Sequence, residues 1–276
     1  MHELIVDATP PRPFLKWAGG KGRLISQYHP YFPQSFERYH EPFLGGGAIF
    51  FHLLPERSRL TDINPELVNV FCTVRDAPER LIALLKGHAA RHSKDYYYQM
   101  RASVPIDRVE RAARLIYLNR TCFNGLYREN SRGQFNVPMG RYKQPLICNA
   151  DLLRSVGRSL RYSEIQVAPF DAVLDQARDR RDFVYFDPPY YPISDTSKFT
   201  AYSRHAFAEA DQIHLRDVFG ALAQRGVQVM LSNSDCEFIR TLYAGFCITT
   251  VSAMRAINSK GDRRGKITEV LITSYQ

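Results

Sequence analysis

Short apolar runs alternate with amphipathic stretches along most of the chain, and this alternation predicts strands and helices in turn. Glycines or an acidic residue follow several of the apolar runs, as expected where a strand ends in a turn. The pattern predicts an α/β fold with a doubly wound sheet. Strands are predicted at residues 38–43, 59–61, 183–186, 227–231 and 268–273, and helices at residues 48–54 and 208–224.

A continuous helical pattern over residues 64–119 interrupts this alternation. Asn64 followed by Pro65 is typical of a helix N-cap and the first helical position. Asp76 and Asp107 each precede a glutamate by three residues, which predicts two further N-caps of the capping-box type. The sequence therefore predicts a helical insertion in the sheet domain.

The segment at residues 121–144 is rich in Asn, Gly, Arg and aromatic residues, and it is expected to be an ordered loop or hairpin that displays side chains. The simplest architecture has a catalytic domain at residues 1–65 and 157–276. An inserted helical domain at residues 66–156 then carries the hairpin.

The chain has 276 residues and 45 % hydrophobic content, enough for one large α/β domain with an insertion. No apolar run is long enough to span a bilayer and no signal pattern is present, so we expect a cytoplasmic monomer without membrane contact. His88 and His92 are four residues apart. Because no third ligand is near them in the sequence, we expect them on a solvated helix face, and we expect no metal.

The formal net charge of +9 favours a polyanionic partner. Arg and Lys are interleaved with Tyr, Phe and Asn between residues 101 and 143, where acidic residues are sparse. This mixture suits contacts with phosphates together with contacts to bases.

The sharpest chemical signal is Asp187-Pro188-Pro189-Tyr190, directly after the apolar run at residues 183–186. Methylation of adenine N6 requires acceptors for the amine hydrogens, because the nitrogen shares its lone pair with the ring. The Asp187 carboxylate and the Pro188 carbonyl suit this role, and the consecutive prolines fix the backbone that aims them. Tyr190 can stack on a base. A strand that ends in a plain proline turn is the structural alternative.

A nucleoside triphosphatase, in which Asp187 would hold magnesium, requires a phosphate-binding loop upstream. The nearest candidate begins at Leu15, where that loop has glycine, and has Gly22 where it has Ser or Thr. Both mismatches exclude this class.

Gly45 and Gly47 follow the first predicted strand, where the backbone can pass close to a ligand; tight packing explains them equally well. Asp62 ends the next strand, where a carboxylate can bond ribose hydroxyls. Phe170 precedes the strand at residues 183–186 and either packs on a cofactor adenine or belongs to the core. A nucleoside cofactor without phosphates, such as S-adenosylmethionine, is consistent with these features.

Together these motifs resemble the Dam-type DNA adenine-N6 methyltransferases, the D12 class with alpha motif order. The resemblance implies a Rossmann-like sheet that uses S-adenosylmethionine, with an inserted helical DNA-recognition domain. It implies that Trp17, Lys21, Phe43, Asp62 and Asp187 contact the cofactor, while Asp187 also serves a flipped adenine. The motifs that carry it are Phe14-Leu15-Lys16-Trp17-Ala18-Gly19-Gly20-Lys21, Glu41-Pro42-Phe43-Leu44-Gly45-Gly46-Gly47, Thr61-Asp62-Ile63-Asn64 and Asp187-Pro188-Pro189-Tyr190.

The hairpin segment is similar to the recognition hairpin of that family, which implies that the target is GATC in double-stranded DNA. Phe123 would be the wedge that replaces the extruded base; it stands where tyrosine is expected and keeps the stacking surface. Leu126, Arg128 and Pro138 would reach base edges, and Arg128 suits bidentate contact with guanine. The other implied DNA-binding residues, which hold phosphates or the hairpin, are Asn124, Asn130, Asn136, Arg141 and Tyr142. A surface hairpin rich in turn residues is the plainer alternative.

Two further segments are candidates for the same site. Lys198-Phe199-Thr200-Ala201-Tyr202 also resembles the family and would close over the flipped base, whereas Ser232-Asn233-Ser234 either faces the ligand or is a polar strand end. A methyltransferase for another amine or amide stays open, although enzymes acting on protein glutamine have Asn in place of Asp187. A catalytically silent DNA-binding protein also stays open. The sequence fits a restriction system, a phage and host regulation equally.

Overall fold

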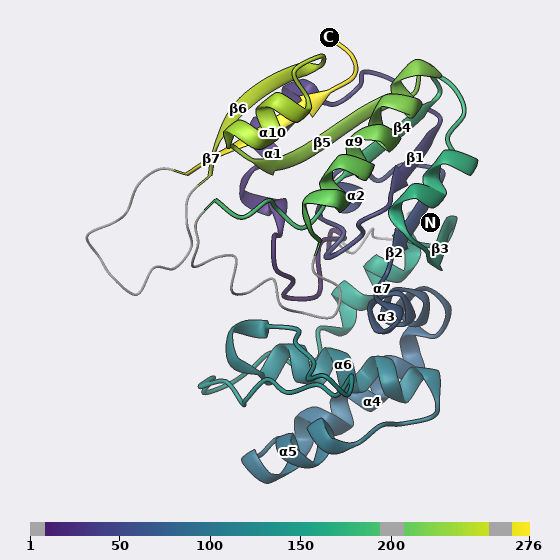
Figure 1. Ribbon diagram of the computed structural model, residues 1–276. Helices are drawn as coiled ribbons and strands as arrows, with labels where there is room; N and C mark the ends of the chain where they lie inside the picture. Colours follow the sequence, from purple (N-terminus) through teal and green to yellow (C-terminus); the bar gives the residue numbers. More distant parts are fainter. Residues whose placement is uncertain (1–8, 194–206, 254–266) are drawn as a thin grey trace, which may run out of the picture. The chain divides into compact units, whose positions relative to one another are not determined.

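The structure is a computed structural model that describes residues 9–193, 207–253 and 267–276 (Figure 1). The chain forms two compact units. The first comprises residues up to Gly20 together with Gly45–Leu54 and Asn64–Val167, and the second comprises Lys21–Leu44, Pro55–Ile63 and the chain from Ala168 onward. The division into a catalytic domain and an insertion at residues 66–156 stays a prediction, and the segment at residues 198–202 lies outside the described residues.

The second unit holds six of the seven sheet strands, in the order β2-β1-β4-β5-β7-β6 (Figure 1). Strands β2, β1, β4 and β5 are parallel, whereas β7 runs antiparallel to both β5 and β6. This confirms the expected Rossmann-like α/β sheet. The elements of this unit are η1 (Lys21–Arg23), α1 (Ile25–Tyr28), η2 (His29–Tyr31), β1 (Arg38–Glu41), β2 (Ser58–Asp62), η4 (Phe170–Asp175), β4 (Asp182–Phe186), α9 (Glu209–Gln224), β5 (Gln228–Ser234), α10 (Glu237–Leu242), β6 (Cys247–Ala253) and β7 (Ile267–Thr273).

Strand β4 is buried on both faces, as expected for a central parallel strand. Val184 and Phe186 belong to the core beneath α9 and α10, which cover the same face of the sheet (Figure 1). Phe183 points to the opposite face, where its ring contacts those of Phe36 and Tyr39. Because side chains alternate along a strand, the residue after Phe186 points to the face of Phe183.

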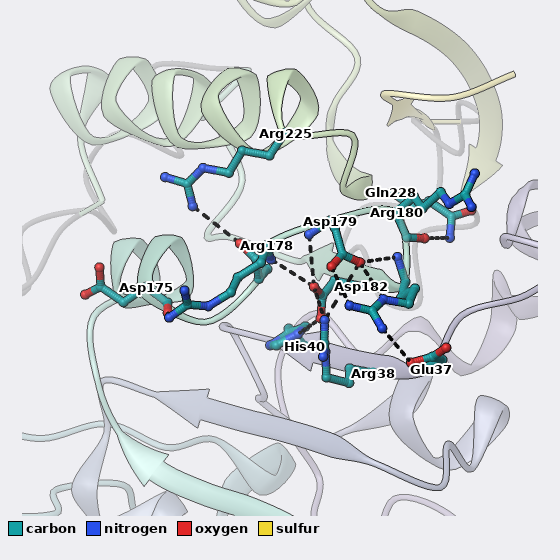
Figure 2. A network of polar contacts seen from close by, with 12 residues as sticks. Glu37, Arg38, His40, Asp175, Arg178, Asp179, Arg180, Asp182, Arg225 and Gln228 are labelled. Carbon is teal, nitrogen blue, oxygen red and sulfur yellow. Dashed lines mark hydrogen bonds and ion pairs between the residues drawn. The ribbon is translucent and has the colours of Figure 1, made fainter.

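A polar network fixes the amino-terminal ends of β1 and β4 (Figure 2). Asp182 is fully buried and accepts from Arg38 at both oxygens, with Nε–Oδ1 and Nη2–Oδ2 distances of 2.6 and 2.8 Å. His40 Nε2 lies 2.9 Å from Oδ1, and the backbone N–H groups of Arg178 and Asp179 donate to Oδ2. Burial alone would raise the pKa of Asp182, but these partners hold it well below its usual range.

The first unit consists mainly of helices, and α6 packs against α3, α4 and α5 (Figure 1). From Leu115 to Asn119 every residue of α6 is buried, as expected for a helix that packs against several others. The elements are α2 (Ala48–Leu53), α3 (Pro65–Asp76), α4 (Pro78–Ala90), α5 (Lys94–Ala102), α6 (Arg108–Thr121), η3 (Phe123–Gly125), α7 (Ala150–Ser159) and β3 (Ser163–Val167).

Two of the three predicted N-caps are confirmed. Asn64 accepts from two backbone N–H groups of α3, and Asp107 does the same in α6. The predicted N-cap at Asp76 is wrong, because α3 continues through this residue and the N-cap of α4 is Ala77. The Asp76 carboxylate pairs with Arg75 and Arg108 instead. Pro78 at the start of α4 has no N–H to cap, which lowers the need for a capping side chain.

The prediction of a solvated face at His88 and His92 is also wrong. His88 is buried and its Nδ1 lies 2.7 Å from the Tyr96 hydroxyl. His92 Nδ1 lies 2.9 Å from the hydroxyl of Tyr117, whose ring contacts both histidines. Burial lowers the pKa of His88 to about 4, so the ring is neutral at pH 7. Hydrogen bonds to tyrosines thus take the place of water at both imidazoles.

Among the described residues, no helix has the length and apolar character needed to cross a membrane.

Candidate active site

The parallel strands of the second unit end along one edge of the sheet, where α/β proteins bind ligands. Phe43 lies just beyond β1, Asp62 ends β2, and Asp187 follows β4 directly. Ser232, Asn233 and Ser234 are the last residues of β5. The predicted motifs of this unit therefore meet at the edge that the fold provides for a site.

Asp187 is held from two directions. Lys21 Nζ lies 2.7 Å from Oδ1, and the Ser232 hydroxyl donates to the same oxygen at 3.0 Å. Ser232 is in turn 2.9 Å from the hydroxyl of Tyr185, on the same face of the sheet. The Lys21 side chain is only 4 % exposed, whereas that of Asp187 is 20 % exposed, so the carboxylate retains an open side.

Two opposing effects act on the negative charge of Asp187. Burial raises its pKa above the usual value, and the Lys21 ion pair and the Ser232 hydrogen bond offset part of that rise. A carboxylate with few partners and a raised pKa has free acceptor capacity, which is a feature of functional sites.

The Tyr190 ring is fixed at its face and at its hydroxyl. Lys21 Nζ lies 4.5 Å from the ring centroid, within cation–π range. The hydroxyl donates to Glu269 Oε2 at 2.6 Å, and the Tyr28 hydroxyl donates to the same oxygen at 3.4 Å. Burial raises the pKa of Tyr190 well above its usual value, with the nearby Asp187 charge adding to the effect, so the hydroxyl stays a donor.

The chain after Asp187 is anchored through its backbone. Gln212 of α9 donates to the Pro189 carbonyl at 2.9 Å, and its own side-chain oxygen accepts from Asn233. Asn233 also accepts from the Tyr191 N–H, and the Ser234 hydroxyl donates to the Tyr191 carbonyl. The polar end of β5 therefore holds the proline turn in place.

Pro188 differs from Pro189 in this respect. No donor among the described residues hydrogen-bonds the Pro188 carbonyl, although Pro188 itself is buried. Two acceptors next to each other in the chain, the Asp187 carboxylate and this carbonyl, are thus available to a ligand with an N–H₂ group.

The aromatic candidates of the second unit stack on each other. The rings of Phe43 and Phe170 are 5.5 Å apart and nearly parallel, and both contact Phe207. Phe170 also lies 5.2 Å from the ring of His214. Both phenylalanines are only partly buried, so their packing here is compatible with the core role and with an exposed ring edge that meets a ligand.

The remaining cofactor candidates, Trp17, Gly45 and Gly47, belong to the first unit. Gly45 and Gly47 have φ values of +49° and +68°, which favour glycine over other residues. The Trp17 ring lies 5.4 Å from that of Tyr127, and a Cβ added at Gly46 would lie 3.4 Å from Trp17 Cβ.

The predicted hairpin is present in the first unit as an irregular antiparallel pair, with bridges between Cys122 and Met139 and between Glu129 and Phe135. Val137 and Phe135 are buried beneath it. The side chains expected to meet DNA are mostly exposed: Phe123, Asn124, Leu126, Arg128, Asn130, Pro138 and Arg141.

The side chains of Arg128, Asn130 and Asn136 form hydrogen bonds within this hairpin. Asn136 Oδ1 accepts from Arg128 Nε at 2.7 Å, which braces the guanidinium while it stays exposed. Asn130 Oδ1 accepts from the N–H groups of Arg132 and Gln134, a turn that closes the tip. Asn130 thus makes hydrogen bonds within the hairpin, and its role toward DNA stays a prediction.

Lys16 joins the base of the hairpin through Asn119. Asn119 accepts from the Lys16 N–H at 2.8 Å and donates to its carbonyl at 2.7 Å and to that of Gly125. Gly125 has φ +66°, and a Cβ there would come within 2.4 Å of Lys16 Cβ, so only glycine fits. The Lys16 ammonium lies 3.9 Å from the Tyr142 ring centroid.

Sequence reasoning missed four side chains that support these sites: Tyr28, Gln212 and Glu269 in the second unit and Asn119 in the first. Their partners lie between 23 and 241 residues away in the chain for the first three. No local pattern marks such residues, because strand order and register bring them to the site.

Comparison with known proteins identifies the family. Residues 17–257 match the family described as D12 class N6 adenine-specific DNA methyltransferase. This chain belongs to that family.

Among its relatives, the type II methyltransferase M1.LlaDCHI of Lactococcus lactis is 44 % identical, covering 96 % of this chain and 95 % of that protein. The type II methyltransferase M.MjaIII of Methanocaldococcus jannaschii is 40 % identical over 96 % of this chain and 99 % of that protein. A DNA adenine methylase of Vibrio cholerae is 36 % identical over 94 % and 95 % of the two chains.

The D12 class methyltransferase described here is therefore an adenine-specific DNA methyltransferase, and its substrate is DNA. Within the described residues, no cluster of His, Cys, Asp or Glu is arranged to hold a metal ion.

Proposed function

We propose that this enzyme methylates adenine N6 within GATC in duplex DNA, with S-adenosylmethionine as the methyl donor, and that it flips the adenine out of the helix. The observation that carries the chemical part of the proposal is the pair of open acceptors at Asp187 and Pro188. A primary amine on a planar ring has two N–H groups and so matches two acceptors that are adjacent in the chain.

The mechanism follows from what these acceptors do to the amine. When Asp187 and the Pro188 carbonyl accept the two N–H groups, electron density returns to the nitrogen as it attacks. S-adenosylmethionine, when bound, supplies an electrophilic methyl group on sulfur. Lys21 keeps Asp187 in its acceptor form by opposing the effect of burial. Tyr190, fixed at its hydroxyl and its face, provides a surface on which the flipped base stacks.

The residues present fit S-adenosylmethionine as the donor. Asp62 ends a parallel strand at the ligand edge and offers a carboxylate for ribose hydroxyls, while Phe43 and Phe170 offer apolar rings for the adenine. Gly45 and Gly47 adopt left-handed backbone conformations and carry no side chains, so a ligand can approach the backbone of the turn after β1 closely. We assign Trp17 and Lys21 to the same cofactor because of their place in the first motif.

The hairpin is assigned to target recognition within an inserted domain at residues 66–156. Arg128 is exposed and braced by Asn136, so its fork is oriented before DNA arrives, as bidentate contact with guanine requires. Phe123 is 50 % exposed and Leu126 is 42 % exposed; these large apolar side chains suit insertion into the duplex and contact with a thymine methyl. Arg141 and Tyr142 are assigned to phosphates.

Methyl transfer from labelled S-adenosylmethionine to a duplex with one GATC tests the proposal. A second duplex, in which that adenine is replaced, reports on the target, and Asp187→Ala reports on the site. Incorporation into the first duplex only, lost in the variant, is the expected result. Equal label on both duplexes would overturn the GATC assignment and leave the chemistry, and full activity of Asp187→Ala would overturn the catalytic assignment.

Flipping is tested separately with 2-aminopurine at the target position. Because this base fluoresces strongly only when unstacked from its neighbours, an increase on binding is expected. No change with the wild type or with Tyr190→Ala, which lacks the ring that quenches a stacked base, on a duplex that the wild type methylates would overturn the flipping step.

A further inference from the structure

Glu269 makes the most unusual contact near the proposed site. It lies on β7, and its Oε2 accepts from two tyrosines, Tyr190 at 2.6 Å and Tyr28 at 3.4 Å. Tyr28 is fully buried in α1. The carboxylate is therefore held by one tyrosine of the core and itself holds the tyrosine that ends the Asp187-Pro188-Pro189-Tyr190 motif.

The position of Glu269 follows from the sheet topology. In β7, Glu269 is the register partner of Ser234, the last residue of β5. Because β7 runs antiparallel to β5, its first residues lie at the edge where the parallel strands end. A strand that otherwise only extends the sheet thus contributes one carboxylate to the ligand edge.

The Tyr190 hydroxyl donates to this carboxylate and lies near the Tyr28 hydroxyl, while Lys21 restrains the face of the ring. A tyrosine side chain rotates about two bonds, χ1 and χ2. A single contact at the face of the ring therefore leaves the ring free to swing and tilt about these bonds. A hydrogen bond at the hydroxyl removes this freedom. Because stacking depends on parallel alignment of ring and base, the orientation of Tyr190 determines how well it receives a flipped adenine.

We propose that Glu269 is a positioning residue that acts through Tyr190 and fixes the ring plane on which the adenine stacks. This inference rests on the proposed function, because it assumes that Tyr190 receives a flipped base. Glu269 does not touch the base; its effect on methyl transfer passes entirely through the tyrosine hydroxyl.

A double-mutant cycle tests this route. Glu269→Ala and Tyr190→Phe each remove the hydrogen bond, while Tyr190→Phe keeps the ring. Each single variant is expected to lower kcat by roughly 2- to 10-fold, the effect of one hydrogen bond, and the double variant is expected to lower it no further. Glu269→Gln keeps an acceptor oxygen and is expected to restore most of the rate.

The fluorescence lifetime of 2-aminopurine at the target position supplies a readout that a purely structural role would not change. Stacking on Tyr190 shortens the lifetime, so Glu269→Ala and Tyr190→Phe are both expected to lengthen it to a similar extent. Glu209→Ala is the matched control, because Glu209 accepts from the hydroxyl of the neighbouring Tyr191 at 3.3 Å in an exposed position. Its lifetime and kcat are expected to equal those of the wild type.

Additive losses in the double variant would overturn the inference, since Glu269 would then act independently of Tyr190. An unchanged lifetime in Glu269→Ala would overturn it as well. Failure of the proposed function is distinguishable: the wild-type enzyme would then give no 2-aminopurine signal or no methyl transfer to adenine, before any variant is compared.

Discussion

The two ends of β4 carry two aspartates with opposite properties. Asp182 begins the strand and has both oxygens occupied by Arg38, His40 and two backbone N–H groups (Figure 2). Asp187 follows the strand, and its partners among the described residues are Lys21 and Ser232, both on one oxygen. The partners hold the pKa of Asp182 well below its usual value, whereas burial raises the pKa of Asp187.

The difference teaches how a carboxylate becomes structural or functional. Every acceptor position that the protein fills stabilises the folded state and removes a position from ligands. Asp182 has no capacity left to serve a substrate, and Asp187 has kept one oxygen. Burial does not explain the opposite pKa shifts, since burial raises the pKa of both residues; the number and direction of their partners does.

Substitution of Asp187 is expected to have the largest effect on activity. Asp187→Asn keeps the size of the side chain but replaces one acceptor oxygen with a donor amide. We expect kcat to fall roughly 100- to 10,000-fold, the range found for positioned acid–base groups. Single-turnover methyl transfer at saturating cofactor measures this. Asp182→Asn is the matched variant, and comparable loss of kcat in its folded form would remove the distinction between the two ends.

Substitution of Asp182 is expected to have the larger effect on stability. Asp182→Asn weakens the bidentate contact with Arg38 and the bonds from the backbone. The free energy of unfolding is expected to fall by about 2–4 kcal/mol, the effect of a few weakened charge-assisted hydrogen bonds. Urea unfolding of both asparagine variants checks this, and a greater loss at Asp187 would contradict it.

The sequence predicted one of these two aspartates. Asp187 stands in a motif with a chemical rationale after a recognisable strand, so both its place and its role were expected. Asp182 carries no such signal, because Arg38 is 144 residues away and meets it only through the β1–β4 register.

The same reasoning explains the other outcomes. Local rules predicted the caps at Asn64 and Asp107, where the partners are the next backbone N–H groups. They failed at Asp76, where a distant arginine competes for the carboxylate, and at His88, where tertiary packing buries the ring. The structural support of the site, including Glu269, depends on strand order and was beyond any local pattern.

The pH dependence of the two ends is expected to differ in sign. Asp182 has a depressed pKa, so its stabilising contribution is present above its unfolded value of about 3.9 and is lost as pH falls below it. Asp187 has a raised pKa, so protonation favours the folded state while it removes the negative charge and turns one acceptor oxygen into a donor. Acid therefore lowers stability through one residue and activity through the other.

The Lys21→Met substitution tests this difference in pH dependence between Asp182 and Asp187. Without the ammonium, burial acts on Asp187 with less opposition, and its pKa rises further. The acid limb of the rate profile is expected to move to higher pH, measured by single-turnover rates at saturating cofactor. Arg38→Met, which removes the corresponding cation from Asp182, is expected to leave that limb in place. An equal displacement in both variants would show that the limb reports on global stability.

The smallest expected effect is at a neutral N-cap, which serves as a reference for the charged network at Asp182. Asn149 caps α7 by accepting from the Leu152 N–H at 3.2 Å, with a neutral side chain. Asn149→Ala is expected to lower the free energy of unfolding by about 1 kcal/mol, the usual loss for an N-cap. Urea unfolding beside Asp182→Asn provides the measurement. If the two losses were equal, the charged network at Asp182 would contribute no more than one neutral cap; a larger loss at Asp182 is expected.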